Sequence, residues 1–350
     1  MQQAVSTAEA GEFEIQETPL EAPDPGWVNL RVRATGICGS DLHALHEPAR
    51  WQSGHVPGHE FSGEIETLGT GVGGWAPGDR VAVFPLLTCG TCGNCRSGRW
   101  HLCDSPFDAF GLTRPGGFSQ RLSVPAVTLL RLGAETDFVL GAMWEPLSVA
   151  IHGYRLAARL DPDRPTTGER VVVLGAGIIG LLSAYYAKEA GAAEVAITAK
   201  YPHQAEAART LGADAVFGSD PDGLKALDDW AKSQPPDVVI ETVGGSADTL
   251  ADAIRLVRRG GRIALLGVFT SDLRLPADGL TLKEPRIVVP FAYSYIGPHA
   301  DHQIALDLLN RDRALLAPLV THRFSLVEAA QAFQTAADKS SGSIKVVVEP

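Results

Sequence analysis

From residue 170 onward, apolar strands alternate with amphipathic helices, and this alternation restricts the fold to a parallel sheet built from βαβ units. The expected strands span residues 170–174, 194–198, 215–217, 237–241, 262–267 and 286–291. The expected helices span residues 178–190, 204–211, 224–232 and 249–259. This half of the chain is therefore predicted to be a doubly wound α/β domain with helices on both faces of its sheet.

The preceding part of the chain lacks this alternation of strands and helices. Short β-like runs, such as 27–34 and 79–84, are separated by turns rich in Gly and Pro, which predicts an irregular β-rich domain. After residue 294 the alternation stops, leaving expected helices at 302–310 and 327–337, a segment at 319–324 and a closing strand at 344–349. We therefore expect a first domain at 1–153, a second at 154–294, and a C-terminal tail at 295–350 that returns to the first domain.

Charge and composition exclude several classes of partner. The formal net charge of −11 disfavours nucleic acids and anionic membrane surfaces, because both require clustered Lys and Arg. The N-terminus is polar and acidic, unlike a signal peptide, and the apolar stretch at 171–187 contains three glycines, unlike a membrane span. We therefore expect a cytoplasmic protein with a small-molecule substrate.

A glycine-rich turn marks the start of the second domain. It follows the apolar strand at 170–174 directly and opens a helix, the context in which G-x-G-x-x-G predicts dinucleotide binding. The first glycine permits a tight turn, the second a close approach of pyrophosphate, and the third close packing of helix on strand. The predicted pyrophosphate-binding turn comprises Gly175, Gly177, Ile178, Ile179 and Gly180.

The end of the second strand of this domain predicts which dinucleotide binds. An Asp or Glu at that point would accept hydrogen bonds from the ribose 2′-hydroxyl of NAD. The strand instead ends in Ala199 and Lys200, which leave room for a 2′-phosphate and can neutralise its charge. We predict a preference for NADP(H); the alternative is that Lys200 is a solvated surface lysine and that NAD(H) is also accepted.

Two groups of residues have the spacing of metal ligands. Four cysteines, Cys89, Cys92, Cys95 and Cys103, form a C-x2-C-x2-C-x7-C pattern that suits a closed, structural zinc site, with a redox pair or an iron–sulfur cluster as alternatives. Separately, Cys38, His59 and Glu60 supply three different ligand types, which can share one metal ion and leave a position open for substrate. The second pattern is typical of a catalytic metal.

Together these motifs resemble the zinc-dependent medium-chain dehydrogenase/reductase family, especially its polyol, sorbitol-like branch. The resemblance rests on C-G-S-D-x-H at 38–43, G-H-E at 58–60, the four-cysteine motif, E-P-L-S-V at 145–149 and the dinucleotide turn, in that order along the chain. It implies a GroES-like β-rich catalytic domain beside a Rossmann-type coenzyme domain. It also implies a dimer or a tetramer.

The resemblance assigns roles to several residues. Cys38, His59 and Glu60 bind the catalytic zinc, and Glu145 either coordinates the ion or holds its water molecule. Ser40 and His43 form a proton relay. Lys345 matches a position that can reach the pyrophosphate; the alternative is that it is a surface lysine. The implied reaction is hydride transfer between an alcohol and its ketone: zinc, acting as a Lewis acid, makes the alcohol hydroxyl more acidic, and the nicotinamide ring takes the hydride. Asp41 is expected to brace the loop that carries the relay.

One position departs from the polyol branch, which typically has Phe-Arg-Tyr where this chain has Phe-Ala-Tyr at 291–293. Ala292 lacks the guanidinium that holds substrate hydroxyls, so a secondary alcohol, diol or amino alcohol is as plausible a substrate as a polyol. Aromatic residues that could line the pocket are Trp51, Phe110 and Tyr293. Two other functions stay open: reduction of an activated C=C or C=N bond on the same fold, and a non-enzymatic zinc-binding redox sensor.

Overall fold

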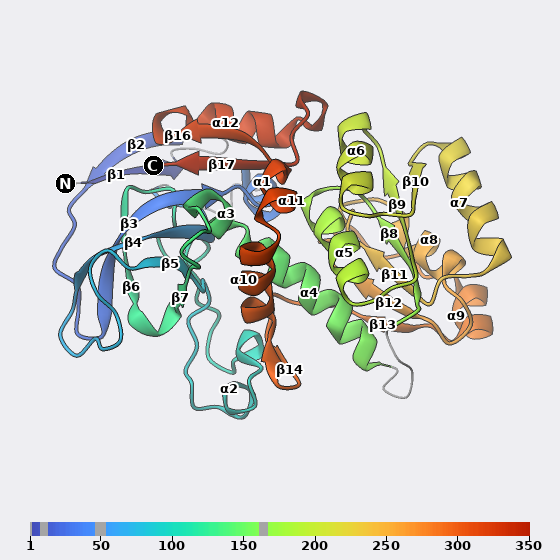
Figure 1. The fold of residues 1–350 in the computed structure, drawn as a ribbon, viewed down its shortest axis with the longest axis horizontal. Helices are drawn as coiled ribbons and strands as arrows, with labels where there is room; N and C mark the ends of the chain where they lie inside the picture. Colours follow the sequence, from blue (N-terminus) through green and yellow to red (C-terminus); the bar gives the residue numbers. More distant parts are fainter. Residues whose placement is uncertain (1, 8–12, 46–53, 161–166) are drawn as a thin grey trace. The chain divides into compact units, whose positions relative to one another are not determined.

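A computed structural model describes residues 2–7, 13–45, 54–160 and 167–350. Within it the chain divides into two compact units (Figure 1). The first unit comprises Met1–Glu145 and Ala305–Pro350, and the second comprises Pro146–Ile304. Trp51, which was expected to line the substrate pocket, lies outside the described residues.

The first unit is built around one largely antiparallel sheet, whose strands follow the order β16-β17-β3-β4-β5-β7, with β6 paired to β3. Its main strands are β3 (Trp27–Gly36), β4 (Glu60–Leu68), β5 (Arg80–Val83), β6 (Arg121–Pro125), β7 (Leu129–Arg131), β16 (Val320–Ser325) and β17 (Lys345–Glu349). A hairpin of β1 (Gln2–Thr7) and β2 (Phe13–Thr18) stands apart from this sheet. Short helices accompany these strands: α1 (Gly39–Leu45), α2 (Gly93–Arg96) and α3 (Phe138–Ala142).

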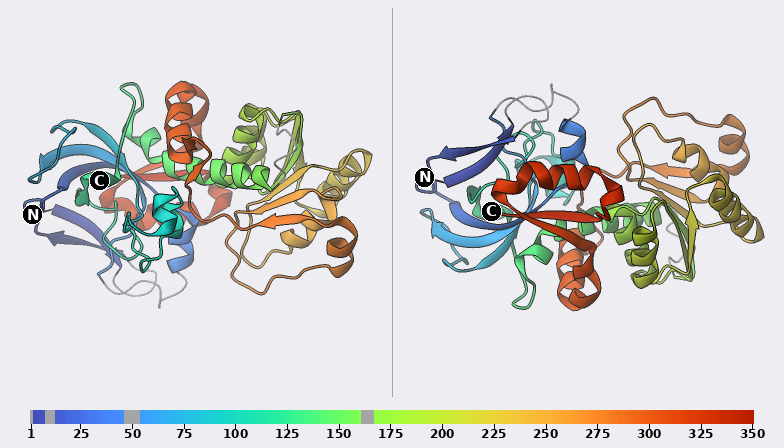
Figure 2. Two further views of the ribbon diagram at one scale, coloured as in Figure 1. Left: turned by 90° about the horizontal axis from the view of Figure 1, so that it is seen from below. Right: turned by 90° about the horizontal axis from the view of Figure 1, so that it is seen from above.

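The C-terminal tail completes this sheet, although it is more than 250 residues away from β3 in sequence. Strand β17 pairs antiparallel with β3 and parallel with β16, and helix α12 (Ala329–Ala337) packs on the same layer. Figure 2 shows this red segment beside the blue N-terminal strands. The ring of Phe333 in α12 packs at a tilt against those of Phe118 and Phe13 in one cluster, so burial of aromatic surface holds the tail in place.

The second unit contains a six-stranded parallel sheet in the order β10-β9-β8-β11-β12-β13. Its strands are β8 (Arg170–Leu174), β9 (Glu194–Ala199), β10 (Ala215–Gly218), β11 (Val238–Glu241), β12 (Arg262–Leu265) and β13 (Arg286–Val288). Because β9 and β10 extend the sheet from one side of β8 and β11 extends it from the other, the chain reverses direction across the sheet between β8 and β11. This arrangement is the doubly wound α/β fold predicted from the sequence.

Helices cover both faces of the parallel sheet (Figure 2). The helices between its strands are α5 (Ile178–Glu189), α6 (Pro202–Thr210), α7 (Pro221–Ser233), α8 (Thr249–Leu256) and α9 (Ala277–Lys283). Apolar residues of α7 and α8 pack in one cluster on alternate residues of β8, β11 and β12, which lie on one face of the sheet. All positions of these three strands are buried, as expected for a parallel sheet covered on both faces. No helix in the described ranges is both long and apolar enough to span a bilayer.

The structure differs from the sequence expectations mainly at element ends. Helix α8 ends at Leu256 rather than 259, because the backbone leaves helical geometry at Val257, whose ψ is 144°. Lys283 satisfies this end by donating to the carbonyl oxygens of Arg255 and Val257. Strand β13 ends at Val288 rather than 291, just before Pro290. Helix α4 (Trp144–Arg159) was not expected, because Pro146 obscures its start; proline is tolerated in a first helical turn.

Candidate functional site

The first metal-ligand cluster arises from the register between β3 and β4. Gly36, the last residue of β3, lies directly opposite Glu60, the first residue of β4. Cys38 follows β3 by two residues and His59 immediately precedes β4, so the antiparallel pairing brings three ligand types to one end of the sheet. Gly36 is required at this point because a side chain there would collide with Glu60 and with Lys345.

The three side chains converge as ligands of one ion would. The ligand atoms of Cys38, His59 and Glu60 all lie within 4.8 Å of one another, and His59 and Glu60 are buried. Burial lowers the pKa of His59, but the negative charges of Cys38 and Asp41 outweigh this effect and hold the pKa well above its usual value. A buried site that concentrates thiolate and carboxylate charge favours a bound cation, and this ligand set suits zinc.

Two buried charged residues support this cluster from outside. The Asp41 carboxylate accepts a hydrogen bond from the backbone N–H of Cys38 at 2.9 Å, and its other oxygen lies 3.7 Å from Nδ1 of His59. Asp41 therefore braces the loop, as the sequence predicted. Lys345 ion-pairs with Glu60 and donates to the carbonyl oxygen of Ile37 at 2.9 Å. The Lys345 side chain is fully enclosed in this unit, and its predicted contact with pyrophosphate stays a prediction.

Glu145 is buried in the first turn of α4 and lies outside the group of three ligand atoms. Its negative charge nevertheless contributes to raising the pKa of His59. The two roles expected from the sequence, ligand of the ion or holder of its water molecule, stay predictions.

The predicted relay residues, Ser40 and His43, both lie on the short helix α1 that follows Cys38. The hydroxyl oxygen of Ser40 is buried and has no hydrogen-bond partner among the described residues. An unpaired buried hydroxyl is costly, so this atom is suited to a partner supplied by a ligand.

The four cysteines also converge. The sulfur of Cys89 lies 3.6 Å from that of Cys103 and 3.9 Å from that of Cys95. In a tetrahedral site with Zn–S bonds of about 2.3 Å, the sulfurs stand about 3.8 Å apart, so the spacing fits zinc. Hydrogen bonds from the backbone and side chain of Thr91 lower the pKa of Cys89 to about 5, whereas burial raises the pKa of Cys95 to about 12. Holding all four sulfurs as thiolates would therefore require a bound cation.

The dinucleotide turn in the second unit has the conformation that its glycines were predicted to provide. Gly175 has a positive φ of 98°. Gly177 is the N-cap residue of α5 and has no side chain to accept a hydrogen bond, so the first N–H groups of this helix have no side-chain cap and suit an anion. Gly180 packs so closely that an added Cβ would overlap the carbonyl oxygen of Gly175.

Two threonines hold the turn in place. The hydroxyl of Thr198 accepts a hydrogen bond from the N–H of Gly175 at 2.8 Å. The hydroxyl of Thr242, after β11, donates to the carbonyl oxygens of Leu174 at 2.8 Å and Gly175 at 3.3 Å. Neither threonine carries a motif of its own, so sequence reasoning missed both.

The second strand of the sheet, β9, ends at Ala199, which is buried, and the exposed Lys200 follows it. The ammonium group of Lys200 lies 5.6 Å from the centre of the Tyr201 ring, which in turn stacks on His203. The structure therefore has no carboxylate at the end of β9 and has a cation beside it.

Comparison with known proteins identifies the family. Residues 24–134 match the alcohol dehydrogenase GroES-like domain and residues 179–311 match the zinc-binding dehydrogenase family. The chain is 32% identical to L-arabinitol 4-dehydrogenase of Aureobasidium melanogenum, over 93% of this chain and 88% of that protein. It is also 32% identical to L-threonine 3-dehydrogenase of Pseudoalteromonas atlantica, over 90% of each chain. A putative zinc-binding dehydrogenase from Sinorhizobium meliloti, solved bound to NADP, superposes with a TM-score of 0.86 at 31% identity, covering 100% of this chain and 99% of that one.

The chain belongs to the zinc-dependent medium-chain dehydrogenase/reductase family. These matches confirm the predicted GroES-like and Rossmann-type architecture, the polyol dehydrogenase branch and the enzymatic class. The protein is therefore an oxidoreductase of the zinc-binding alcohol dehydrogenase class that uses a nicotinamide dinucleotide. The comparisons do not favour a C=C or C=N reductase or a redox sensor.

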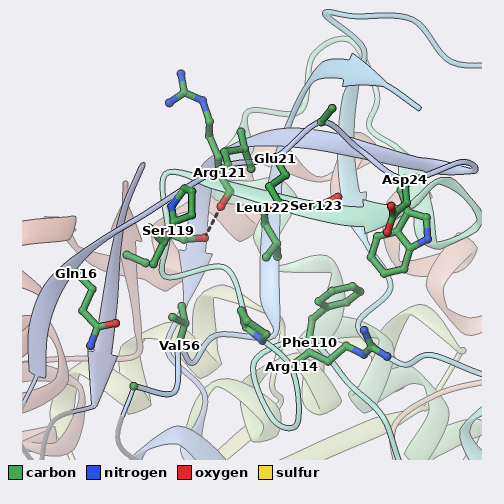
Figure 3. Close-up of a pocket in the computed structure, with 18 residues that line it drawn as sticks. Gln16, Glu21, Asp24, Val56, Phe110, Arg114, Ser119, Arg121, Leu122 and Ser123 are labelled. Atoms are coloured by element: carbon green, nitrogen blue, oxygen red, sulfur yellow. Dashed lines mark hydrogen bonds between the residues drawn. The ribbon is translucent and has the colours of Figure 1, made fainter. Parts of the chain in front are cut away.

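The aromatic residues proposed for the substrate pocket of this dehydrogenase are buried. Phe110 packs edge-on against Phe61 in the core of the first unit, at a centroid distance of 6.4 Å. Phe110 also lines a pocket of about 450 Å³ beside β2 and β6 (Figure 3), whose lining does not include the zinc-ligand cluster. Tyr293 is completely buried in the second unit. The assignment of both rings to the substrate stays a prediction.

Two substitutions separate the roles of the glycines in the dinucleotide turn. Gly180→Ala should destabilise the dehydrogenase by about 1–3 kcal/mol, because the new methyl group overlaps backbone and lies 2.8 Å from the Thr242 hydroxyl. Gly177→Ala meets no atom within 4 Å and keeps a φ of −70°, so its stability should change by no more than about 0.5 kcal/mol. Thermal unfolding and dinucleotide titration measure both effects.

Comparing Gly177→Ala with Gly180→Ala separates an effect on dinucleotide binding from an effect on stability. Gly177→Ala should bind the dinucleotide more weakly while unfolding at the temperature of the parent protein, since its methyl group occupies the surface that the pyrophosphate approaches. Unchanged dinucleotide affinity in Gly177→Ala would contradict that placement.

Proposed function

We propose that this enzyme transfers hydride between NADP(H) and a secondary alcohol, diol, polyol or amino alcohol, with the corresponding ketone as the other substrate. The convergence of Cys38, His59 and Glu60 carries the proposal, because a mixed ligand set on a buried charged cluster leaves a coordination position for substrate. Zinc bound there would act as a Lewis acid toward the substrate oxygen. The closed site of Cys89, Cys92, Cys95 and Cys103 would order the surrounding loop.

The residues around the catalytic cluster would handle charge and protons. Glu145 would act on the centre either as a ligand or through a water molecule. Ser40, whose hydroxyl lacks a partner among the described residues, would accept the proton that leaves the substrate hydroxyl, and His43 on the same helix would pass it on toward solvent. Asp41 would keep His59 correctly oriented through its carboxylate.

The second unit would bind the dinucleotide at the turn formed by Gly175, Gly177, Ile178, Ile179 and Gly180. The preference for NADP(H) over NAD(H) is supported by Ala199 and Lys200, since nothing acidic at the end of β9 would repel a 2′-phosphate. The similar NADP-bound dehydrogenase from S. meliloti is consistent with this preference.

Substrate range would be set in part by Ala292. This residue has a φ of 50°, a left-handed conformation that is uncommon for residues other than glycine. Its methyl side chain offers no hydrogen bond to a substrate hydroxyl, so we expect activity to extend to alcohols with few hydroxyl groups. Polyols and amino alcohols remain in the range because the related proteins named above are, by name, arabinitol and threonine dehydrogenases.

A homodimer is the assembly that the second unit supports best. Strand β13 forms one edge of its sheet, and exposed apolar residues flank it in sequence: Val289, 71% exposed, follows it directly, and Leu282, 64% exposed, precedes it in α9. An exposed edge strand flanked by apolar residues favours pairing with another chain. A two-fold axis would pair β13 with its copy in the partner.

A panel of secondary alcohols, diols, polyols and their ketones, assayed by absorbance of the reduced nicotinamide, tests the function. The parent enzyme should oxidise alcohols and contain about two zinc ions per chain, one in each ligand set. Cys38→Ala should retain about one zinc and lose about a thousandfold in kcat, since a Lewis acid supplies several kcal/mol of transition-state stabilisation.

The control is Cys92→Ala, which should lose the other zinc. It should make residues 84–108 sensitive to protease, whereas Cys38→Ala should keep that segment as resistant as in the parent enzyme. Full alcohol oxidation by Cys38→Ala would refute the proposed mechanism.

Ala199→Asp tests the preference for NADP(H). The new carboxylate would accept hydrogen bonds from the NADH ribose and repel the NADPH 2′-phosphate, so the ratio of kcat/KM for NADPH over NADH should fall by about a hundredfold. Lys200→Ala should lower kcat/KM for NADPH and leave that for NADH unchanged. A clear preference of the parent enzyme for NADH would be incompatible with the proposal.

Val289→Asp tests the assembly. A charge placed at an apolar interface is costly, so this variant should shift the protein from the mass of two chains to that of one in light scattering after size exclusion. Val327→Asp, a substitution at an equally exposed position of the first unit, is the matched control and should leave the mass unchanged. A monomeric parent protein would rule out the dimer.

A further inference from the structure

Glu241, the last residue of β11, places a completely buried carboxylate at the carboxyl end of the parallel sheet. One oxygen of this carboxylate, Oε1, accepts three hydrogen bonds. They come from the N–H of Val243 at 2.7 Å, the N–H of Gly244 at 3.0 Å and the hydroxyl of Thr249 at 2.7 Å. Thr249 is the first residue of helix α8, so the hydrogen bonds to this one oxygen atom link the end of β11 to the 242–249 loop and to the following helix.

Close backbone contacts join this loop to the loop after β12. Oε2 of Glu241 is buried, has no hydrogen-bond partner in the described part of the chain, and lies against Gly267, where any side chain would collide with it. Gly244 has a φ of 61°, and a Cβ there would lie 2.6 Å from the backbone nitrogen of Val268. The N–H of Gly245 donates to the carbonyl oxygen of Val268 at 2.8 Å. The loop after β11 is therefore locked against the loop after β12.

The same loop lies against the dinucleotide turn. A Cβ at Gly175 would meet Cγ2 of Val243 at 2.8 Å and the hydroxyl of Thr242 at 2.9 Å. Thr242 donates to the carbonyl oxygen of Gly175, and Val243 is 49% exposed. The position of the first glycine of the turn thus depends on where the loop after β11 lies.

The order of the strands places this loop where doubly wound sheets bind their ligands. In doubly wound sheets, ligands bind outside the carboxyl ends of the strands at the point where strand order reverses. Here the reversal falls between β8, which leads into the dinucleotide turn, and β11, which ends at Glu241. The loop held by Glu241 therefore lies beside the dinucleotide turn at this reversal point.

We propose that Glu241 is a positioning residue for the dinucleotide: its buried carboxylate fixes the 242–249 loop, and with it the crevice that the dinucleotide enters. This inference rests on the dinucleotide binding described above. It requires no contact between Glu241 and the dinucleotide, because the carboxylate acts through the backbone that it holds. Affinity for the dinucleotide should depend on Glu241, whereas turnover in the filled site should not.

The test measures the dissociation constants of NADPH and NADH by nucleotide fluorescence, kcat at saturating dinucleotide, and the unfolding temperature. Glu241→Ala removes all three hydrogen bonds and should raise the Kd for NADPH about tenfold or more. Glu241→Gln keeps an acceptor oxygen without the charge, and Thr249→Val removes one donor; each should raise Kd about threefold. All three variants should keep kcat at saturation within about twofold of the parent value.

Asp237, which immediately precedes β11, supplies the matched control at the end of the strand opposite to Glu241. Its buried carboxylate accepts hydrogen bonds from the Arg170 N–H at 3.0 Å and from Arg258 at 2.6 Å. Asp237→Asn should lower the unfolding temperature and leave both dissociation constants unchanged. A merely structural role for Glu241 would make the two positions behave alike.

The outcomes are distinct. If Glu241→Ala fails to fold, Glu241→Gln and Thr249→Val still test the proposal. Unchanged Kd in those two variants, or an equal rise in Asp237→Asn, would overturn it while leaving the enzyme a dehydrogenase. A parent protein that binds neither NADPH nor NADH would overturn this inference and the dinucleotide function together.

Discussion

The pairing of β3 with β4 is the constraint on which the metal centre depends. It places Gly36 opposite Glu60, and the missing side chain at Gly36 leaves space for the buried ion pair between Glu60 and Lys345. A shift of one residue in this register would turn Glu60 to the other face of the sheet and separate it from Cys38. The chemistry of the site therefore rests on backbone hydrogen bonds between strands, since these hold the ligands in place before any ion binds.

In the second unit, side chains rather than strand register hold the binding residues in position. Its glycine-rich turn has few side-chain atoms of its own, so neighbouring strands must hold it in position. Thr198 of β9 and Thr242 after β11 provide hydrogen bonds from both sides, and Glu241 fixes the loop that carries Thr242. Glycine lets a phosphate approach closely but leaves the backbone flexible. Polar side chains at the strand ends restore the rigidity of the turn through hydrogen bonds.

The sequence predicted the features that depend on short spacing. The four cysteines within fifteen residues, the turn at 175–180 and the strand–helix alternation each carry their signal locally. Contacts between distant residues left no such signal: Lys345 bonds to Ile37 across 308 positions, and Thr242 reaches Gly175 across 67. Helix α4 was missed because Pro146 resembles a helix breaker unless its place in the first turn is known.

The Ser40 hydroxyl is one of several buried polar atoms without a hydrogen-bond partner among the described residues, and its place two residues after Cys38 gives it functional interest. Asp41 and Lys345 are buried, and each has a charged neighbour within the first unit. The charge of His59 offsets only part of the cost of burying Asp41, because burial still raises the pKa of this carboxyl group. The Ser40 hydroxyl has no such compensation. Because a buried hydroxyl without a partner costs free energy, its retention beside Cys38 is better explained by a partner that arrives with substrate or cofactor than by folding.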